Sequence, residues 1–238
     1  MLFFYVRHGD PIYNPDSLTP LGERQAEAIG KRLALYGIDK IYSSTSNRAY
    51  LTAKPTAEIL KKEIEQVDFA KEGYAWAELT SIDFDEKRRW FFQNSKVRKA
   101  LVSKEVLDLG DKWYDHPLFA DTKAKAGIER ITAASDEFFK NLGYEHIAGT
   151  GAYKVINDND DRVALFAHQG FGLAFFSCLL DISYPRFAMH YDMSHSGMTV
   201  VEFKNEGGIA VPKVLTFAND SHLYREGLPT KYNNEIYF

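Results

Sequence analysis

Continuous apolar runs alternate with one-sided helical patterns along the first quarter of the chain. Residues 2–6, LFFYV, are all apolar, which is typical of a strand buried on both faces of a parallel sheet. Residues 18–37, LTPLGERQAEAIGKRLALYG, place Ala26, Ile29 and Leu33 on one helical face, which predicts an amphipathic helix. Its ends are marked by a threonine before a proline and by a final glycine, which are typical helix-capping residues.

The same alternation continues through the rest of the chain. IDKIYSS, residues 38–44, predicts a strand, and residues 46–63 predict a helix that Pro55 should kink or split. Between the first strand and helix, DPIYNPD has the composition of a loop. The chain also contains a helical pattern over residues 126–144, a buried strand running into a helix over residues 162–180, and a final hairpin turning at Gly207 and Gly208.

This order of strands and helices predicts one α/β domain spanning residues 1–238. We expect a three-layer sandwich with a mostly parallel sheet and helices on both faces. Residues 80–125 break the pattern, because they mix charges and aromatic side chains without a clear strand. They predict a helical insertion that lies over the active site at the end of the sheet.

The composition is that of an ordinary folded protein, with 45% hydrophobic and 26% charged residues. A formal net charge of −4 argues against a nucleic-acid partner, and no apolar run is long enough for a membrane helix. The single cysteine, Cys178, is expected to pack in the core. With no recognisable signal peptide, we expect a cytoplasmic protein. A homo-oligomer remains open, since the apolar residues Ile236, Tyr237 and Phe238 could pack on this domain or on a partner subunit.

Two strand ends share one feature. FFYVRHGD and ALFAHQGF each deliver a histidine, His8 or His168, directly after an apolar strand. Ligands of open α/β sheets gather at the carboxyl ends of the strands, so these two histidines are expected to face each other. Arg7 precedes His8, and Arg48 follows a third strand at a helix start. Two guanidinium groups and two imidazoles would repel one another without an anion, and a phosphoryl group would satisfy them.

The ordered motifs VRHGD, LTPLGERQAEAIGKRL, IYSSTSNRAYLTA, FAHQGFG and NDSHL resemble those of the histidine phosphatase superfamily, the phosphoglycerate-mutase-like proteins. The resemblance implies that His8 accepts the phosphoryl group and that Arg7, Arg48 and His168 bind its oxygens. It further implies that Asn14 contacts the phosphate and that no metal or other cofactor is required.

The resemblance also implies a general acid on a loop after the second helix. Glu78 in YAWAELT is the predicted match, and the alternatives are Glu72, Asp83 and Asp85. A working acid would protonate the leaving oxygen and later take a proton from water.

Some positions depart from the family pattern or stay open. Pro11 stands where many members have a threonine. His195 replaces a frequent asparagine and is either a structural histidine or a pocket-lining residue, whereas His222 is expected to be structural. In the insertion, Arg88, Arg89 and Trp90 could line the pocket and meet a second anionic group or a ring, but a solvated helix face is the simpler interpretation.

We therefore predict a metal-independent phosphatase that hydrolyses small phosphomonoesters through a phosphohistidine at His8. Two alternatives remain. A phosphoglycerate-type mutase would return the phosphoryl group to its product, and a non-catalytic phosphate-binding module would use the same fold without turnover.

Overall fold

A six-stranded sheet forms the centre of the computed structural model, which describes residues 1–230 and 232. Four neighbouring strands run parallel, and β11 runs antiparallel to both of its neighbours. The predicted, mostly parallel sheet is confirmed. In spatial order the strands are β14 (Lys213–Asn219), β11 (Met198–Glu202), β1 (Leu2–Arg7), β10 (Arg162–Ala167), β4 (Lys40–Ser44) and β5 (Ile64–Val67).

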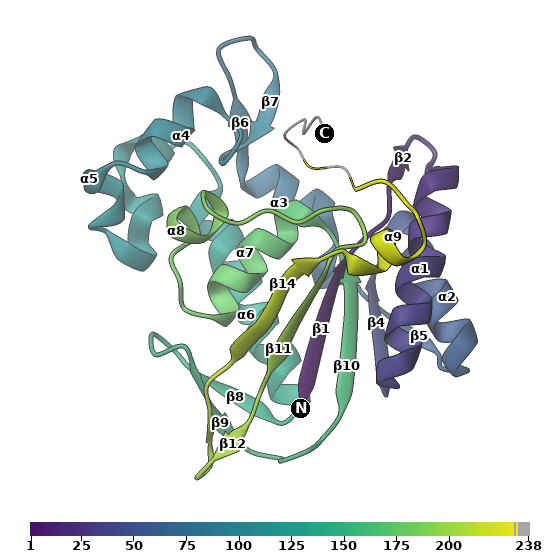
Figure 1. Ribbon diagram of the computed structural model, residues 1–238. Coiled ribbons are helices and arrows are strands. Elements are labelled where there is room, and N and C mark those ends of the chain that lie inside the picture. The colour runs from purple at the N-terminus through teal and green to yellow at the C-terminus, as the bar shows by residue number, and fades with distance from the viewer. Residues whose placement is uncertain (231, 233–238) are drawn as a thin grey trace.

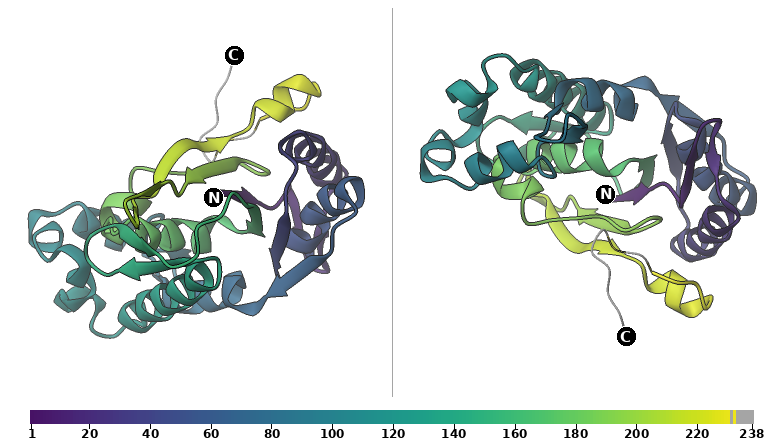
Figure 2. Two further views of the ribbon diagram at one scale, coloured as in Figure 1. Left: turned by 90° about the horizontal axis from the view of Figure 1, so that it is seen from below. Right: turned by 90° about the horizontal axis from the view of Figure 1, so that it is seen from above.

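Helices cover both faces of this sheet, as predicted (Figures 1 and 2). On one face lie α1 (Pro20–Tyr36) and α2 (Asn47–Leu60). On the other lie α6 (Ala124–Asn141) and α7 (Gln169–Leu179). The last described helix, α9 (Ser221–Arg225), packs beside α1.

The all-apolar sequence of β1 follows from its place between these layers. Phe3 and Tyr5 point into the core under α6 and α7, while Phe4 and Val6 point into the core under α1 and α2. All four side chains are fully buried. Removing such a side chain from water contributes about 1.5–3 kcal/mol, so β1 is a rigid mount for the residues that follow it.

The predicted ends of α1 are confirmed. The Thr19 hydroxyl accepts a hydrogen bond from the Gly22 amide, and Gly37 closes the helix with a φ of +71°. In α2 the predicted split at Pro55 is wrong, because the helix continues to Leu60. Gly30 of α1 lies directly against Pro55, and we infer that this close packing holds the helix together.

Two segments contain strands that the sequence pattern did not reveal. The loop DPIYNPD contributes to a hairpin of β2 (Pro11–Tyr13) and β3 (Asp16–Leu18). The insertion begins with a hairpin of β6 (Thr80–Ile82) and β7 (Arg88–Trp90). Three-residue strands are too short to show alternation.

The rest of the insertion is helical, as predicted. It contains α4 (Ser95–Leu101), α5 (Lys104–Leu107) and the 3-10 turns η2 (Gly110–Asp115) and η3 (Pro117–Phe119). Before it lie η1 (Asp68–Ala70) and α3 (Glu72–Glu78), and after α7 comes α8 (Tyr184–Ala188).

A second, antiparallel sheet lies below the central one in Figure 1. Its order is β12 (Asn205–Glu206), β13 (Ile209–Ala210), β9 (Ala152–Val155) and β8 (Tyr144–Ile147). The predicted turn at Gly207 and Gly208 joins β12 to β13, with φ of +67° and +90°. The residues 233–238, which include the apolar end of the chain, lie outside the described part of the structure. In the described part, no helix has the length and apolarity needed to cross a membrane.

His146 joins this second sheet to the helical layer and should make stability depend on pH. Its Nδ1 lies 2.8 Å from Asp136 of α6, and its Nε2 lies 3.1 Å from Asp181 after α7. The bond to Asp136, helped by the charge of both carboxylates, raises the pKa of His146. The stabilisation is therefore complete below the unfolded pKa of about 6.5 and is lost as pH rises through the higher folded pKa.

We predict that His146→Gln lowers the free energy of unfolding by about 1–3 kcal/mol near pH 6 and by clearly less near pH 9. Urea unfolding of both proteins across this range measures the difference. A loss that is constant or grows with pH would contradict a protonated His146.

Candidate active site

The pairing of β1 with β10 brings the two strand-end histidines together, as the sequence predicts. Arg7 pairs with Ala167, and the His8 amide donates to the Ala167 carbonyl at 2.9 Å. The rings of His8 and His168 consequently lie with their centroids 5.2 Å apart. Both side chains are buried at the carboxyl ends of their strands, and His168 directly precedes α7.

The glycine after His8 is required by a close backbone approach. A Cβ on Gly9 would lie 2.6 Å from the carbonyl oxygen of Gly22 in α1, which is a severe clash. The Gly9 amide donates to Thr52 Oγ1 at 3.0 Å, and Thr52 donates to the carbonyl of Arg48. This network ties the loop after β1 to α1 and α2.

The His8 ring is prepared as a nucleophile. Its Nδ1 lies 2.7 Å from the Gly9 carbonyl oxygen, which can only accept, so Nδ1 carries the proton and Nε2 keeps its lone pair. Burial lowers the pKa of His8 well below its usual value, and His168, Arg7 and Arg48 lower it further. The imidazole is therefore neutral at physiological pH, as nucleophilic attack requires.

His168 presents the opposite nitrogen as a donor. Ser44 Oγ lies 2.8 Å from His168 Nε2 and 3.4 Å from its alternative acceptor, Ser46 Oγ. We assign the Ser44 proton to the shorter of these two contacts. Nδ1 of His168 then carries the hydrogen. Burial lowers the pKa of His168 well below its usual value, with Arg48 and Arg7 adding to the shift. The Tyr5 hydroxyl donates to the His168 carbonyl at 2.7 Å and fixes its backbone.

Arg7 and Arg48 bring two positive charges to the same place. Arg7 donates to the Met193 carbonyl and contacts His195 Nε2 at 2.8 Å. Arg48 donates to Asp16 at 2.9 Å and to Glu72 at 2.8 Å. Among the described residues, the buried Nε of each arginine and Nδ1 of His168 have no hydrogen-bond partner.

Unpaired buried donors are rare because each costs about 1–3 kcal/mol. Three of them in one cluster, all on cationic or neutral nitrogens, match a ligand that only accepts. A phosphoryl group has the required charge and oxygens.

Glu72, the first of the alternatives to Glu78, brings its carboxylate to both Arg48 and His168 in this cluster. Glu72 Oε2 lies 3.6 Å from His168 Nδ1, and Oε1 accepts from the Gly170 amide at 3.2 Å. Glu78 stands at the other end of α3, about 9 Å further along the helix axis. There it forms a two-pronged ion pair with Arg130 of α6. The structure thus does not bring Glu78 to the other predicted residues, because the helix carries it past the site.

The other predicted residues are distributed around the cluster. His195 lies in it, with its ring centroid 5.6 Å from that of His8 and its Nδ1 3.4 Å from Asp10. Asn14 is exposed at the tip of the β2–β3 hairpin. His222 is structural, since it bonds Ser196 at 2.9 Å and burial lowers its pKa to about 4.

Arg88 and Arg89 are engaged within the insertion and do not reach the cluster. Arg88 donates to Thr80, and Arg89 pairs with Asp83 and Asp85. Trp90, the next residue, lines the pocket instead. Asp83 and Asp85, which were alternatives for the general acid, are both paired with Arg89.

The cluster also contains the one combination of described side chains that could hold a metal ion. Ligand atoms of His8, Glu72 and His168 lie within 4.8 Å of one another. Arg7 and Arg48 lie close enough to both imidazoles to lower their pKa, and they would repel a divalent cation. This charge distribution favours an anion.

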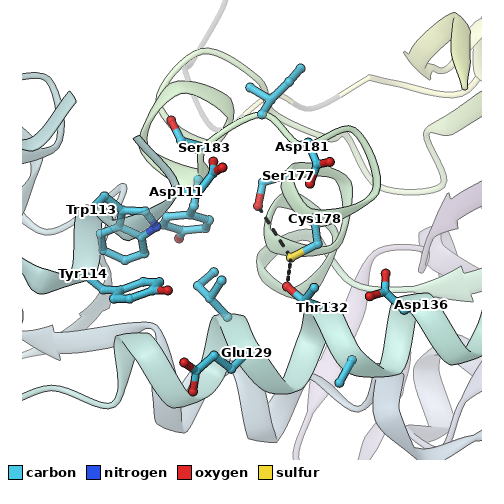
Figure 3. A pocket seen from close by; sticks show the side chains of 14 residues that line it. Asp111, Trp113, Tyr114, Glu129, Thr132, Asp136, Ser177, Cys178, Asp181 and Ser183 are labelled. Carbon is cyan, nitrogen blue, oxygen red and sulfur yellow. Dashed lines mark hydrogen bonds between the residues drawn. The ribbon is translucent and has the colours of Figure 1, made fainter. Parts of the chain in front are cut away.

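A pocket of about 560 Å³ opens beside Arg48 and Glu72. A smaller cavity of about 370 Å³ lies elsewhere, between α6, α7 and the insertion (Figure 3). Its described lining holds aromatic and acidic residues but no lysine, arginine or histidine, so it is unsuited to phosphate. Cys178 lines it, and burial raises the pKa of this thiol to about 11, so it remains an unreactive packing residue.

Comparisons with known proteins support this fold. Residues 3–115 match the model of the histidine phosphatase superfamily (branch 1). The phosphoserine phosphatase of Entamoeba histolytica, solved with phosphoserine, superposes with a TM-score of 0.61 at 18% identity, covering 93% of this chain and 98% of its own. A mycobacterial glucosyl-3-phosphoglycerate phosphatase gives a TM-score of 0.58 at 18% identity, covering 91% and 98%. No curated protein sequence matches the chain.

Residues 3–115, just under half of the chain, are similar to the histidine phosphatase superfamily (branch 1). The family match covers the strand and helices that carry Arg7, His8, Arg48 and Glu72. The solved structures, at this low identity, establish the fold across the remainder, where His168 and His195 lie.

We predict that in Ser44→Ala the His168 ring is no longer fixed in one tautomer. Without the hydroxyl, Nε2 loses its donor and the proton distributes between both ring nitrogens. Nitrogen-15 NMR of the imidazole should show the Nδ1–H form in the parent protein and a mixture in the variant, with about three- to tenfold weaker binding of inorganic phosphate.

Ser43→Ala is the matched control, since this neighbouring buried hydroxyl donates to a backbone carbonyl. It should leave the His168 spectrum unchanged. An unaltered spectrum in Ser44→Ala would contradict the assigned tautomer.

Proposed function

We propose that this protein is a metal-independent phosphatase that hydrolyses phosphomonoesters through a covalent phosphohistidine at His8. The observation that carries the proposal is the set of three buried unpaired nitrogens, on Arg7, Arg48 and His168, around a neutral His8 imidazole. Fixed cationic donors stabilise the charge that develops on the equatorial phosphoryl oxygens.

In the first step, the Nε2 lone pair of His8 forms a bond to phosphorus while the bond from phosphorus to the ester oxygen breaks. The leaving oxygen takes a proton from the carboxylic acid of Glu72. We assign this role to Glu72 because its carboxyl group touches Arg48 and lies 3.6 Å from His168. The negative charge of a bound phosphate favours the protonated form of a neighbouring carboxylate.

In the second step, water attacks the phosphorus of the phosphohistidine and the bond from nitrogen to phosphorus breaks. The Glu72 carboxylate takes a proton from this water, which restores the acid and releases inorganic phosphate. His8 Nδ1 keeps its proton through both steps, because the Gly9 carbonyl accepts it throughout.

The location and partners of the protein follow as part of the same proposal. A free, buried Cys178 supports a reducing compartment such as the cytoplasm. The substrate is a small phosphorylated molecule, and the net charge of −4 argues against nucleic acid.

We predict that His8→Ala lowers kcat on a general aryl phosphate about a thousandfold or more and abolishes the phosphohistidine. Acid-quenched reactions with a ³²P-labelled ester measure the intermediate. Excess EDTA should leave the parent activity unchanged. Full turnover by the variant, or loss of parent activity on chelation, would refute this mechanism.

A matched pair of carboxamide variants tests the choice of acid. We predict that Glu72→Gln lowers kcat about 10²- to 10⁴-fold on alkyl phosphates, and by less on p-nitrophenyl phosphate, whose leaving group needs no acid. Glu78→Gln should keep kcat within about twofold and lose about 1 kcal/mol of stability by weakening the pair with Arg130. The reverse pattern would assign the acid to Glu78.

A further inference from the structure

The pocket beside the phosphate site is walled by aromatic side chains from three different elements. Its described lining includes Tyr13 of the β2–β3 hairpin, Trp76 of α3 and Trp90 of the β6–β7 hairpin. Tyr13 is 69% exposed and Trp76 is 38% exposed, so both present ring surface to a ligand. A volume of about 560 Å³ suits a small molecule.

The rings of Trp76 and Trp90 lie close to Glu72, the proposed acid. Trp76 follows Glu72 by one helical turn, so the two side chains share a face of α3. Trp90 packs so closely on the first turn of α7 that a Cβ on Gly170 would lie 2.3 Å from its ring. The amide of Gly170 binds Glu72. The leaving group that receives the proton of Glu72 would therefore emerge between these rings.

The rings also support one another and the cationic centre. Trp76 and Trp90 meet edge to face, with centroids 5.1 Å apart. The Arg48 guanidinium lies 5.4 Å from the centroid of the Tyr13 ring, which orients Tyr13 at the mouth. The aromatic wall is thus continuous with the phosphate-binding residues.

The charges of the pocket lining do not favour a second anion. Arg48 is already paired with Asp16 and Glu72. Lys71 is the remaining basic residue of the described lining, and its ammonium group lies 5.9 Å from the centroid of the Tyr74 ring. Beyond the phosphate, the described lining offers three aromatic side chains and this single lysine.

We infer that the substrates of this protein are phosphomonoesters whose leaving group carries an uncharged aromatic ring. This inference rests on the proposed phosphatase function. Tyr13 and Trp76 are the residues that contact the ring, and Trp90 positions Trp76 beside Glu72.

The experiment compares esters that differ in the ring but share the same chemistry. Propyl, 2-cyclohexylethyl and 2-phenylethyl phosphate all release an unactivated primary alcohol, so differences in kcat/KM report binding of the leaving group. We expect the phenyl ester to exceed the propyl ester by about tenfold or more and to exceed the cyclohexyl ester as well. Phosphoserine, whose serine part carries an ammonium and a carboxylate group, should be the poorest substrate.

Variants then test whether the aromatic side chains of the pocket cause the preference for the phenyl ester. Trp76→Ala and Tyr13→Ala should each lower the phenyl-to-propyl ratio about three- to tenfold, and Trp76→Phe should retain most of it. Phe84→Ala is the matched control, because this exposed ring lies between β6 and β7, on the hairpin that carries Trp90, but outside the described pocket lining. It should leave the ratio unchanged. Thermal unfolding checks that each variant is folded.

The outcomes separate the two proposals. Turnover of all four esters with a phenyl-to-propyl ratio near one, or with equal phenyl and cyclohexyl values, would overturn the aromatic assignment and leave the phosphatase intact. If phosphoserine is preferred and Lys71→Ala removes that preference, the aromatic assignment is replaced by an anion-binding site at Lys71. Failure to hydrolyse any of the esters would overturn both proposals.

Discussion

The parallel pairing of β1 with β10 is the constraint on which the site depends. It fixes His8 against His168 through the bond from the His8 amide to the Ala167 carbonyl. Tyr5 reinforces this geometry from within β1, since its hydroxyl holds the His168 backbone. A slip of one residue would turn His8 toward the opposite face of the sheet. The apolar side chains of β1 prevent such a slip, because they fill two different cores.

The site must also bury positive charge. The surrounding residues lower the cost of this burial only in part. Asp16 and Glu72 pair with Arg48 at its two terminal nitrogens, which lowers the cost of burying its charge. The imidazoles avoid that cost by staying neutral. The remaining unpaired donors belong to the same groups, so a phosphoryl group would complete a network that the protein leaves incomplete.

The sequence predicted the parts of the site that follow long strands. A five-residue apolar run ending in Arg7 and His8 is a strong local signal, and the same signal precedes His168. The helix α1, whose capping residues are visible in the sequence, was predicted to within a residue. The β6–β7 hairpin escaped detection because its strands have three residues each. The choice between Glu72 and Glu78 could not be made from spacing alone, since both lie on one short helix and only tertiary packing shows which end faces Arg48.

The long strands of the central sheet and the short elements that project beyond it have different roles in the proposed function. Apart from Glu72 on α3, the groups proposed to bind and transfer phosphate stand on or directly beside strands of the central sheet, where two cores fix their positions. The aromatic wall stands on the β2–β3 hairpin, on α3 and on the β6–β7 hairpin, which project beyond the sheet. Substitutions in these projecting elements can change the leaving-group pocket without disturbing the β1–β10 pairing. Selection among phosphoesters can therefore vary through Tyr13 and Trp90 while the transfer chemistry stays the same, because their hairpins carry none of the groups proposed to transfer phosphate. Trp76 is more constrained, since it shares α3 with Glu72.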